Sequence, residues 1–103
     1  MQSDLVALLG LGIRARTVVV GAEGARATLK RGRAALIVVA EDRSRRTEQK
    51  VVRLAEGAGV DVIAGPPSAE LGRLSKRGPV QALAVTDSNL ARGISALGAK
   101  KER

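Results

Sequence analysis

The chain has 103 residues, of which 45% are hydrophobic and 27% are charged. This is the length of one domain, with a composition typical of a folded globular protein. It contains no Cys, His or aromatic residue, which excludes the usual zinc sites, thiol or imidazole nucleophiles and disulfides. Eighteen Lys and Arg residues against ten Asp and Glu residues give a formal net charge of +8, and this excess indicates a polyanionic partner, with nucleic acid the leading candidate.

Membrane association is not expected from the sequence. The longest apolar stretches, such as Ala34 to Ala40, are far shorter than the ~20 residues that a membrane span needs. The first ten residues include Asp4 and lack the positive start of a signal peptide. We therefore expect a cytoplasmic protein with no membrane partner.

Helical and strand-like patterns alternate along the first forty residues. Ser3 and Asp4 can cap a helix whose apolar face begins at Leu5. The following predicted elements are a β-branched strand, a helix and a fully buried strand, over Thr17–Val20, Ala22–Arg31 and Ala35–Ala40.

The alternation continues to the end of the chain. Ser44 or Thr47 can cap a helix that includes Val51 to Ala58, and Thr86 and Asp87 can cap a last helix with an apolar face of Leu90, Ile94 and Leu97. Between these helices the pattern predicts a strand, a short helix and another strand, over Val60–Ala64, Ser68–Leu74 and Gln81–Val85. Residues 99–103 are expected to fray.

Strands that alternate with helices predict an α/β fold. We expect one domain over residues 1–103, built as a three-layer α-β-α sandwich around a four-stranded mixed sheet. The sequence contains no internal repeat and no linker.

The segment GLGIRA, from Gly10 to Ala15, matches the form of a dinucleotide-binding fingerprint. That fingerprint requires a preceding strand and an acidic residue about 20 positions later. Here a capped helix precedes it, and Lys30, Arg31 and Arg33 occupy the later region. These glycines therefore indicate local packing or a helix end.

The segment TVVVGAEGARATLKRG, from Thr17 to Gly32, places a glycine at a helix start. Such a start offers unpaired N–H groups and a partial positive charge to an anion. Glu23 lies in this first turn and would repel a phosphate, although its carboxylate can accept hydrogen bonds from base amino groups. Base reading and an ordinary strand-to-helix turn both remain open at this point.

Glu41 and Asp42 are adjacent carboxylates at the end of a predicted strand. Such a pair can bind a metal or act as acid and base, but no other ligand clusters with it in the sequence. Asp42 is better explained as a residue that caps or precedes the next helix. We predict no enzyme activity, no catalytic residue, no metal site and no cofactor.

Three longer segments together resemble a known family. They are LLGLGIRARTVVVGAEG, AALIVVAEDRSRRTEQKV and LGRLSKRGPVQALAVTD. In order and almost without gaps, they are similar to the kink-turn RNA-binding ribosomal-protein superfamily of L7Ae and L30e, and most of all to its short YlxQ-like bacterial branch. The most recognisable points are Ala40 to Asp42, Leu71 with Gly72, and Ala84 to Asp87.

The resemblance implies an α-β-α sandwich that binds structured RNA, typically a kink-turn. In this family the start of the second helix carries a G-x-N-E-x-x-K pattern that reads guanine edges, and the loop before the last strand packs on a flipped-out nucleotide. Only the glycine of that pattern is present here, as Gly21, whereas Glu23, Gly24 and Ala27 occupy the Asn, Glu and Lys positions. Arg26 is a candidate substitute for the missing lysine.

The sequence and the resemblance together predict binding of structured RNA, ribosomal or ribosome-associated. The predicted RNA-binding residues lie at the second helix and near the loop before the last strand: Gly21, Ala22, Glu23, Gly24, Arg26, Lys30, Arg31, Arg73, Lys76, Arg77, Gly78 and Pro79. By analogy with the family we expect a monomer.

A second basic group belongs to the predicted third helix, and the sequence does not show whether it faces the same surface: Arg43, Arg45, Arg46, Lys50 and Arg53. The alternative is a protein-interaction or ribosome-docking module that keeps the fold but has lost kink-turn base readout.

Overall fold

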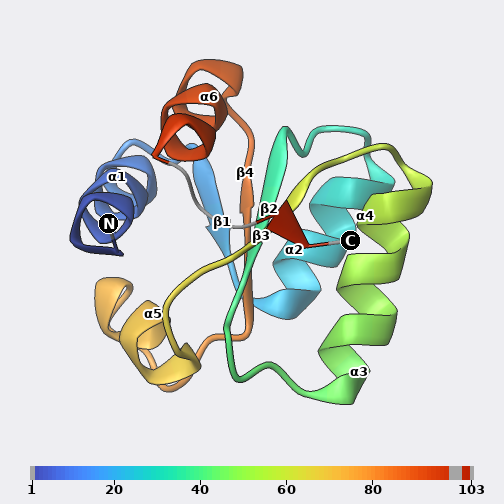
Figure 1. Ribbon diagram of the computed structural model, residues 1–103, viewed down its shortest axis with the longest axis horizontal. Helices are drawn as coiled ribbons and strands as arrows, with labels where there is room; N and C mark the ends of the chain where they lie inside the picture. Colours follow the sequence, from blue (N-terminus) through green and yellow to red (C-terminus); the bar gives the residue numbers. More distant parts are fainter. Residues whose placement is uncertain (1, 98–100, 103) are drawn as a thin grey trace.

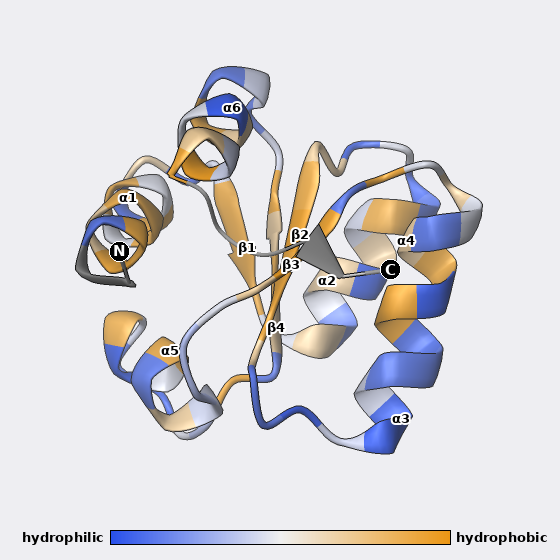
Figure 2. Ribbon diagram, in the orientation of Figure 1, coloured by the Kyte–Doolittle hydropathy of each residue, from blue (hydrophilic) through white to orange (hydrophobic). Residues whose placement is uncertain are grey.

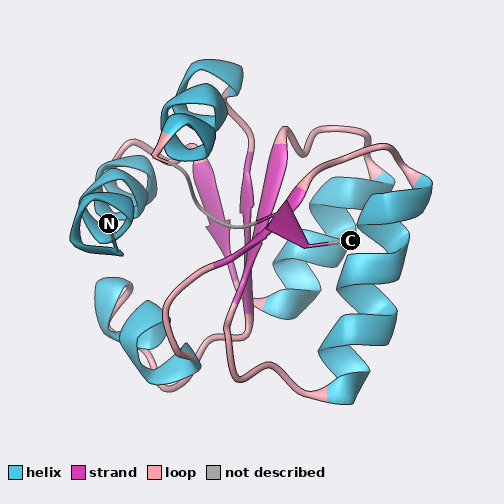
Figure 3. Cartoon of the chain, viewed as in Figure 1, coloured by secondary structure: helices cyan, strands magenta, loops and turns pink. Residues whose placement is uncertain are grey.

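The computed structural model describes residues 2–97 and 101–102 as three layers, seen edge-on in Figure 1. Three helices cover one face of a sheet: α1 (Gln2–Arg14), α5 (Ser68–Leu74) and α6 (Ser88–Ala96). The other face is covered by α2 (Ala22–Lys30) and by a rod made of α3 (Arg45–Thr47), the π-helical turn η1 (Glu48–Val52) and α4 (Arg53–Gly57). Figure 3 separates these helical layers from the strands by colour. The predicted α-β-α sandwich is confirmed.

Four strands form the body of the sheet, in the order β1-β4-β2-β3. They are β1 (Val18–Val20), β2 (Leu36–Val39), β3 (Val62–Ala64) and β4 (Ala82–Val85). β2 pairs with β3 in parallel, whereas β4 pairs antiparallel with both β1 and β2. The predicted four-stranded mixed sheet is therefore present.

A short fifth strand extends this sheet at the β3 edge. β5 (Lys101–Glu102) pairs antiparallel with β3, with Lys101 opposite Ile63. The free edge of β3 offers unpaired backbone groups to these two residues, whereas fraying of residues 99–103 stays a prediction. Residues 99, 100 and 103 of that prediction lie outside the described residues.

The core lies on both faces of the sheet, as expected for central strands that are apolar throughout. Val38 and Leu83 pack towards α1, α5 and α6, whereas their strand neighbours Ile37 and Ala84 pack towards α2 and the rod. This is the period-two alternation of a strand, here with both faces covered. Figure 2 shows the apolar strands lying between helices that contain both polar and apolar residues.

Capping side chains start two helices as the sequence predicts. Asp87 accepts a hydrogen bond from the Leu90 N–H of α6 at 3.1 Å, and Ser44 accepts one from the Thr47 N–H of α3 at 3.1 Å. Asp42 precedes α3 but does not cap it. Its carboxylate instead accepts hydrogen bonds from the Ser68 N–H and hydroxyl, at 2.8 and 2.9 Å, and so caps α5 from a distant part of the chain.

The glycines of GLGIRA lie inside α1, after no strand, so the dinucleotide fingerprint has no structural basis here. Gly12 is a packing residue. A Cβ at this position would lie 2.4 Å from Val18 Cγ2 and 2.6 Å from Leu90 Cδ2. The missing side chain therefore allows α1 to approach β1 and α6 closely.

Candidate nucleic-acid interface

Three segments that are distant in sequence meet at one end of the sheet, at the bottom of Figure 1, where strands terminate. β1 and β2 both terminate at this end of the sheet and β4 begins there, because β4 runs antiparallel to both of them. Backbone hydrogen bonds join the segments: the Gly21 N–H donates to the Ala82 oxygen at 2.9 Å, and the Ala40 N–H donates to the Gln81 oxygen at 2.8 Å. The start of α2, the loop before β4 and the start of α3 are thereby brought together.

Gly21 makes the sharp turn from β1 into α2. Its φ of 104° lies in the region that favours glycine, and no side chain caps the helix that follows. The first turn of α2 therefore keeps N–H groups available to a ligand. Glu23 in this turn is exposed, where a carboxylate can meet the amino group of a base but disfavours a phosphate.

The loop between α5 and β4 folds back onto Gly72. The Gly72 carbonyl accepts hydrogen bonds from the Ser75 and Arg77 N–H groups, at 3.1 and 2.9 Å. A Cβ on Gly72 would lie only 2.2 Å from the Gly78 carbonyl oxygen. The pair Leu71 and Gly72 thus has two structural roles, because Leu71 is fully buried in the core and Gly72 allows the loop to close.

Arg77 connects this loop to the start of α2. Its Nη1 donates a hydrogen bond to the Val20 oxygen at 3.2 Å, at the end of β1. Beside it lies an open hollow with a volume of about 340 Å³, within the size range of small-ligand sites. Its lining residues come from both segments: Gly21, Ala22, Arg77, Gly78, Pro79, Val80 and Gln81.

A smaller hollow of about 60 Å³ lies between the first turns of α2 and the rod. Ala22 lines both hollows, so they adjoin each other. The smaller one is lined by three cationic side chains and one carboxylate, together with small or apolar residues: Ala22, Glu23, Arg26, Arg46, Thr47, Lys50 and Val51.

Arg46 and Lys50 were not among the predicted site residues. The sequence contained a usable signal, because residues four apart share one face of a helix. Thr47 and Val51 are buried, so their neighbours Arg46 and Lys50 border the contact with α2. The sequence did not show that α2 packs against this part of the rod. It therefore could not tell which surface of the protein Arg46 and Lys50 belong to.

Gln81 fixes the start of α3 against the loop before β4. Its Oε1 accepts hydrogen bonds from the Ser44 N–H at 2.7 Å and from the Thr47 hydroxyl at 2.9 Å. One side chain thereby positions both the N-cap of α3 and the end of the loop. The three segments form a single surface with defined relative positions.

The other predicted residues do not all face this surface. Gly24 is turned towards the sheet, where a Cβ would lie 2.6 Å from Val19 Cγ1. Lys30 ends α2 and Arg31 follows it, about 12 Å along the helix axis from Ala22. Arg73 and Lys76 are exposed near the loop but line neither hollow.

The acidic pair at the end of β2 has a structural explanation. Hydrogen bonds from the Ser68 N–H and hydroxyl lower the pKa of Asp42 below its ordinary value, since they stabilise the charged carboxylate. Glu41 is exposed. In the described part of the chain, no group of three or more Asp or Glu side chains is placed to hold a metal ion.

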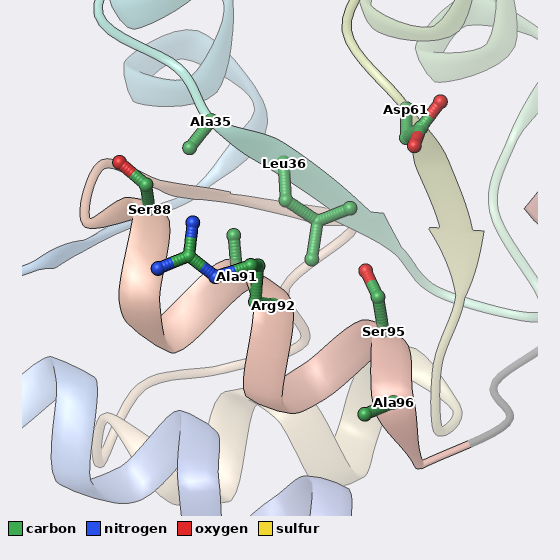
Figure 4. Close-up of a pocket in the computed structure, with 8 residues that line it drawn as sticks. All are labelled: Ala35, Leu36, Asp61, Ser88, Ala91, Arg92, Ser95 and Ala96. Carbon is green, nitrogen blue, oxygen red and sulfur yellow. The ribbon is translucent and has the colours of Figure 1, made fainter.

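A larger hollow, of about 710 Å³, lies at the opposite end of the sheet. Figure 4 shows its lining, which comes from α6 and from the starts of β2 and β3. Arg92 and Asp61 are its charged residues, and the others are small or apolar: Ala35, Leu36, Ser88, Ala91, Ser95 and Ala96. None of the residues predicted to bind RNA lies here.

The fold is that of a small α-β-α domain, and the hollows at the start of α2 are lined by several cationic side chains. The family model of the ribosomal protein L7Ae/L30e/S12e/Gadd45 family matches residues 5–94. The chain belongs to this family, which generally binds RNA and ribosomal components and is non-catalytic.

A solved structure from Bacillus halodurans, described as a protein with unknown function, is also similar to this chain. The two superpose with a TM-score of 0.82 at 25% sequence identity, over 90% of this chain and 94% of that one. A comparison with curated proteins gives no significant match. Within residues 2–97 and 101–102, no helix is both long and apolar enough to cross a membrane.

Proposed function

We propose that this protein binds structured RNA of kink-turn type, as a ribosomal or ribosome-associated factor, and catalyses no reaction. The observation that carries the proposal is the convergence of the α2 start and the loop before β4 on one surface, around a hollow of about 340 Å³. Family membership and the net charge of +8 support the same function.

The surface offers two kinds of contact. Backbone N–H groups of the α2 start and the Glu23 carboxylate can form hydrogen bonds with base edges, which carry sequence information. Arg26 can donate to guanine acceptors, and Arg77 adds a cationic group for phosphates, whose contacts contribute affinity but no sequence readout. The protein therefore combines polar base contacts with neutralisation of the RNA backbone.

The test compares a kink-turn RNA with an unrelated duplex of equal length over a salt series. We expect the preference for the kink-turn to persist at high salt, because base contacts depend little on counterion release. A steep salt dependence without any preference would contradict the kink-turn part of the proposal. Absence of RNA binding at physiological salt would overturn the function and favour the protein-interaction module.

Arg26 is the residue proposed to replace the cation missing at Ala27. Arg26→Ala should weaken kink-turn binding by about tenfold, the effect of losing one good base contact. The matched control is Arg92→Ala, which removes the same charge at the opposite end of the sheet. Equal affinities of the Arg26 variant and the unmodified protein would reject this role.

The same proposal places the protein in the cytoplasm as a monomer. Sedimentation equilibrium should give the mass of one chain, 10.7 kDa. Sedimentation of a cell extract should place part of the protein with ribosomal particles. Complete recovery in the fractions free of ribosomes would contradict the ribosomal association but not RNA binding itself.

A further inference from the structure

We propose that the RNA-binding surface extends from the start of α2 onto the first turns of the rod, where Arg46 and Lys50 bind the phosphate backbone. This inference rests on the function proposed above and adds to it a path for the RNA strand. Its basis is the smaller hollow, at which Arg26, Arg46 and Lys50 converge from two helices.

The sizes of the two adjoining hollows assign them different ligands. The hollow of about 60 Å³ is much the smaller of the two, and we assign to it phosphate oxygens and not a base. The hollow of about 340 Å³ beside Pro79 is large enough for a base. Because Ala22 lines both, a nucleotide in the larger hollow would direct its backbone towards Arg46 and Lys50.

The charges around the smaller hollow favour an anion. Glu48 follows Thr47 in the rod, but its carboxylate is paired with Arg43 Nε at 2.6 Å. Glu23 is the only carboxylate among the residues that line the hollow, against three cations. Arg46 and Lys50 are both exposed, so they can reach a phosphate without burying a charge.

The rod is also held in place for this role. The Ser44 and Thr47 hydrogen bonds to Gln81 fix its first turn relative to the loop. The cations of α3 and η1 are therefore presented at a defined distance from the loop, which a contact on a continuous RNA backbone requires. A cation on a mobile segment would add only general attraction.

The test uses two double variants that remove the same charge from the same rod. Arg46→Gln with Lys50→Gln removes the proposed contacts, whereas Arg45→Gln with Arg53→Gln removes two exposed cations that do not line the hollow. Loss of two phosphate contacts should make the negative slope of log affinity against log salt shallower by about 2, and should lower affinity at about 0.1 M salt by roughly fiftyfold. The second variant should show a much smaller change.

Equal slopes in the two variants would overturn the inference while leaving the proposed function intact. A failure of the unmodified protein to bind either RNA would instead overturn the proposed function, so the two failures are distinguishable. Circular dichroism of both variants should match that of the unmodified protein, as a check that the fold is unchanged.

A mapping experiment gives independent evidence, because the chain contains no cysteine. Arg46→Cys provides a single attachment point for a reagent that cleaves RNA by hydroxyl radicals, and Ser95→Cys provides a control at the opposite end of the sheet. We expect strong cleavage of bound kink-turn RNA from position 46 and little from position 95. Equal cleavage from both positions would overturn the proposed path.

Discussion

The two ends of the sheet carry hollows of opposite character. The hollow between α6 and the starts of β2 and β3 is the larger, at about 710 Å³, but it has one Arg and one Asp among mostly small side chains. The hollows at the α2 start are smaller, at about 340 and 60 Å³, and together they present Arg77, Arg26, Arg46 and Lys50. The largest hollow and the hollows lined by several cations thus lie at different ends of the sheet.

Under the proposed function, charge and backbone geometry mark the RNA surface more than cavity size does. RNA affinity comes largely from phosphate neutralisation, which needs exposed cations on a surface and no deep pocket. Base reading needs fixed hydrogen-bonding groups, which the turn at Gly21 and the loop closed on Gly72 provide. The hollow beside α6 has a single cation, Arg92, among its lining residues.

The largest expected effect concerns the loop between α5 and β4, which folds back onto Gly72. Gly72→Ala places a Cβ against the Gly78 carbonyl oxygen, which is backbone and cannot move aside at low cost. We expect the free energy of unfolding to fall by about 3 kcal/mol. RNA affinity should fall as well, because the loop is displaced from the start of α2. Denaturant unfolding measures the first effect.

The matched control is Gly57→Ala in α4, where a Cβ meets nothing within 4 Å. This change should raise the free energy of unfolding by about 0.5 kcal/mol, because alanine is the better helix former. A Gly72 variant as stable as the Gly57 variant would contradict the role assigned to loop closure.

Arg77→Ala breaks the hydrogen bond to the Val20 oxygen and removes a cation that lines the hollow of about 340 Å³. RNA affinity should fall by about tenfold, the effect of losing a cationic contact together with its positioning. Arg92→Ala removes the same charge at the opposite end and should change affinity by no more than about twofold. Equal losses would show that only net charge matters and that the two ends are equivalent.

Glu23→Gln separates phosphate attraction from base reading. Removal of the carboxylate should raise affinity for an unrelated duplex several-fold, since it no longer repels phosphates. The preference for a kink-turn should fall by about tenfold, because a hydrogen-bond acceptor for base amino groups is weakened. Glu56→Gln, at an exposed position of α4, is the control for charge alone, and an equal gain for both RNAs would contradict base reading by Glu23.

The smallest expected effect concerns the hydrogen bonds between Asp42 and Ser68, which join the end of β2 to the start of α5. The pKa of Asp42 is lowered in the folded protein by its hydrogen bonds to Ser68, so the ionised carboxylate stabilises the fold above its ordinary pKa of about 4. Asp42→Ala should therefore lower the Tm by a few degrees near neutral pH. The difference from the unmodified protein should shrink as the pH falls below about 4, where the carboxylate becomes protonated. A difference that stays constant with pH would contradict this explanation, and Glu41→Ala serves as the control.

Local patterns in the sequence identified most of the elements. The β-branched and apolar runs at Val18 and Leu36 form strands because they can be buried on both faces of a sheet. Ser44 and Asp87 start helices because their side chains accept hydrogen bonds from unpaired N–H groups. The role of Asp42 was not predictable in the same way, since its partner Ser68 is 26 residues away.

By itself, the sequence determined the α/β class, the excess of positive charge, the exclusion of thiol and imidazole chemistry, and the glycine turn at Gly21. These properties depend on composition and on neighbours within a few residues. Only the tertiary structure decided which cations share a surface: it placed Arg46 and Lys50 beside Arg26, turned Gly24 towards Val19 and left Lys30 at the far end of α2. The physical reason is that such a surface is made by the order of strands and the packing of helices between distant segments, and a local pattern carries no record of that order.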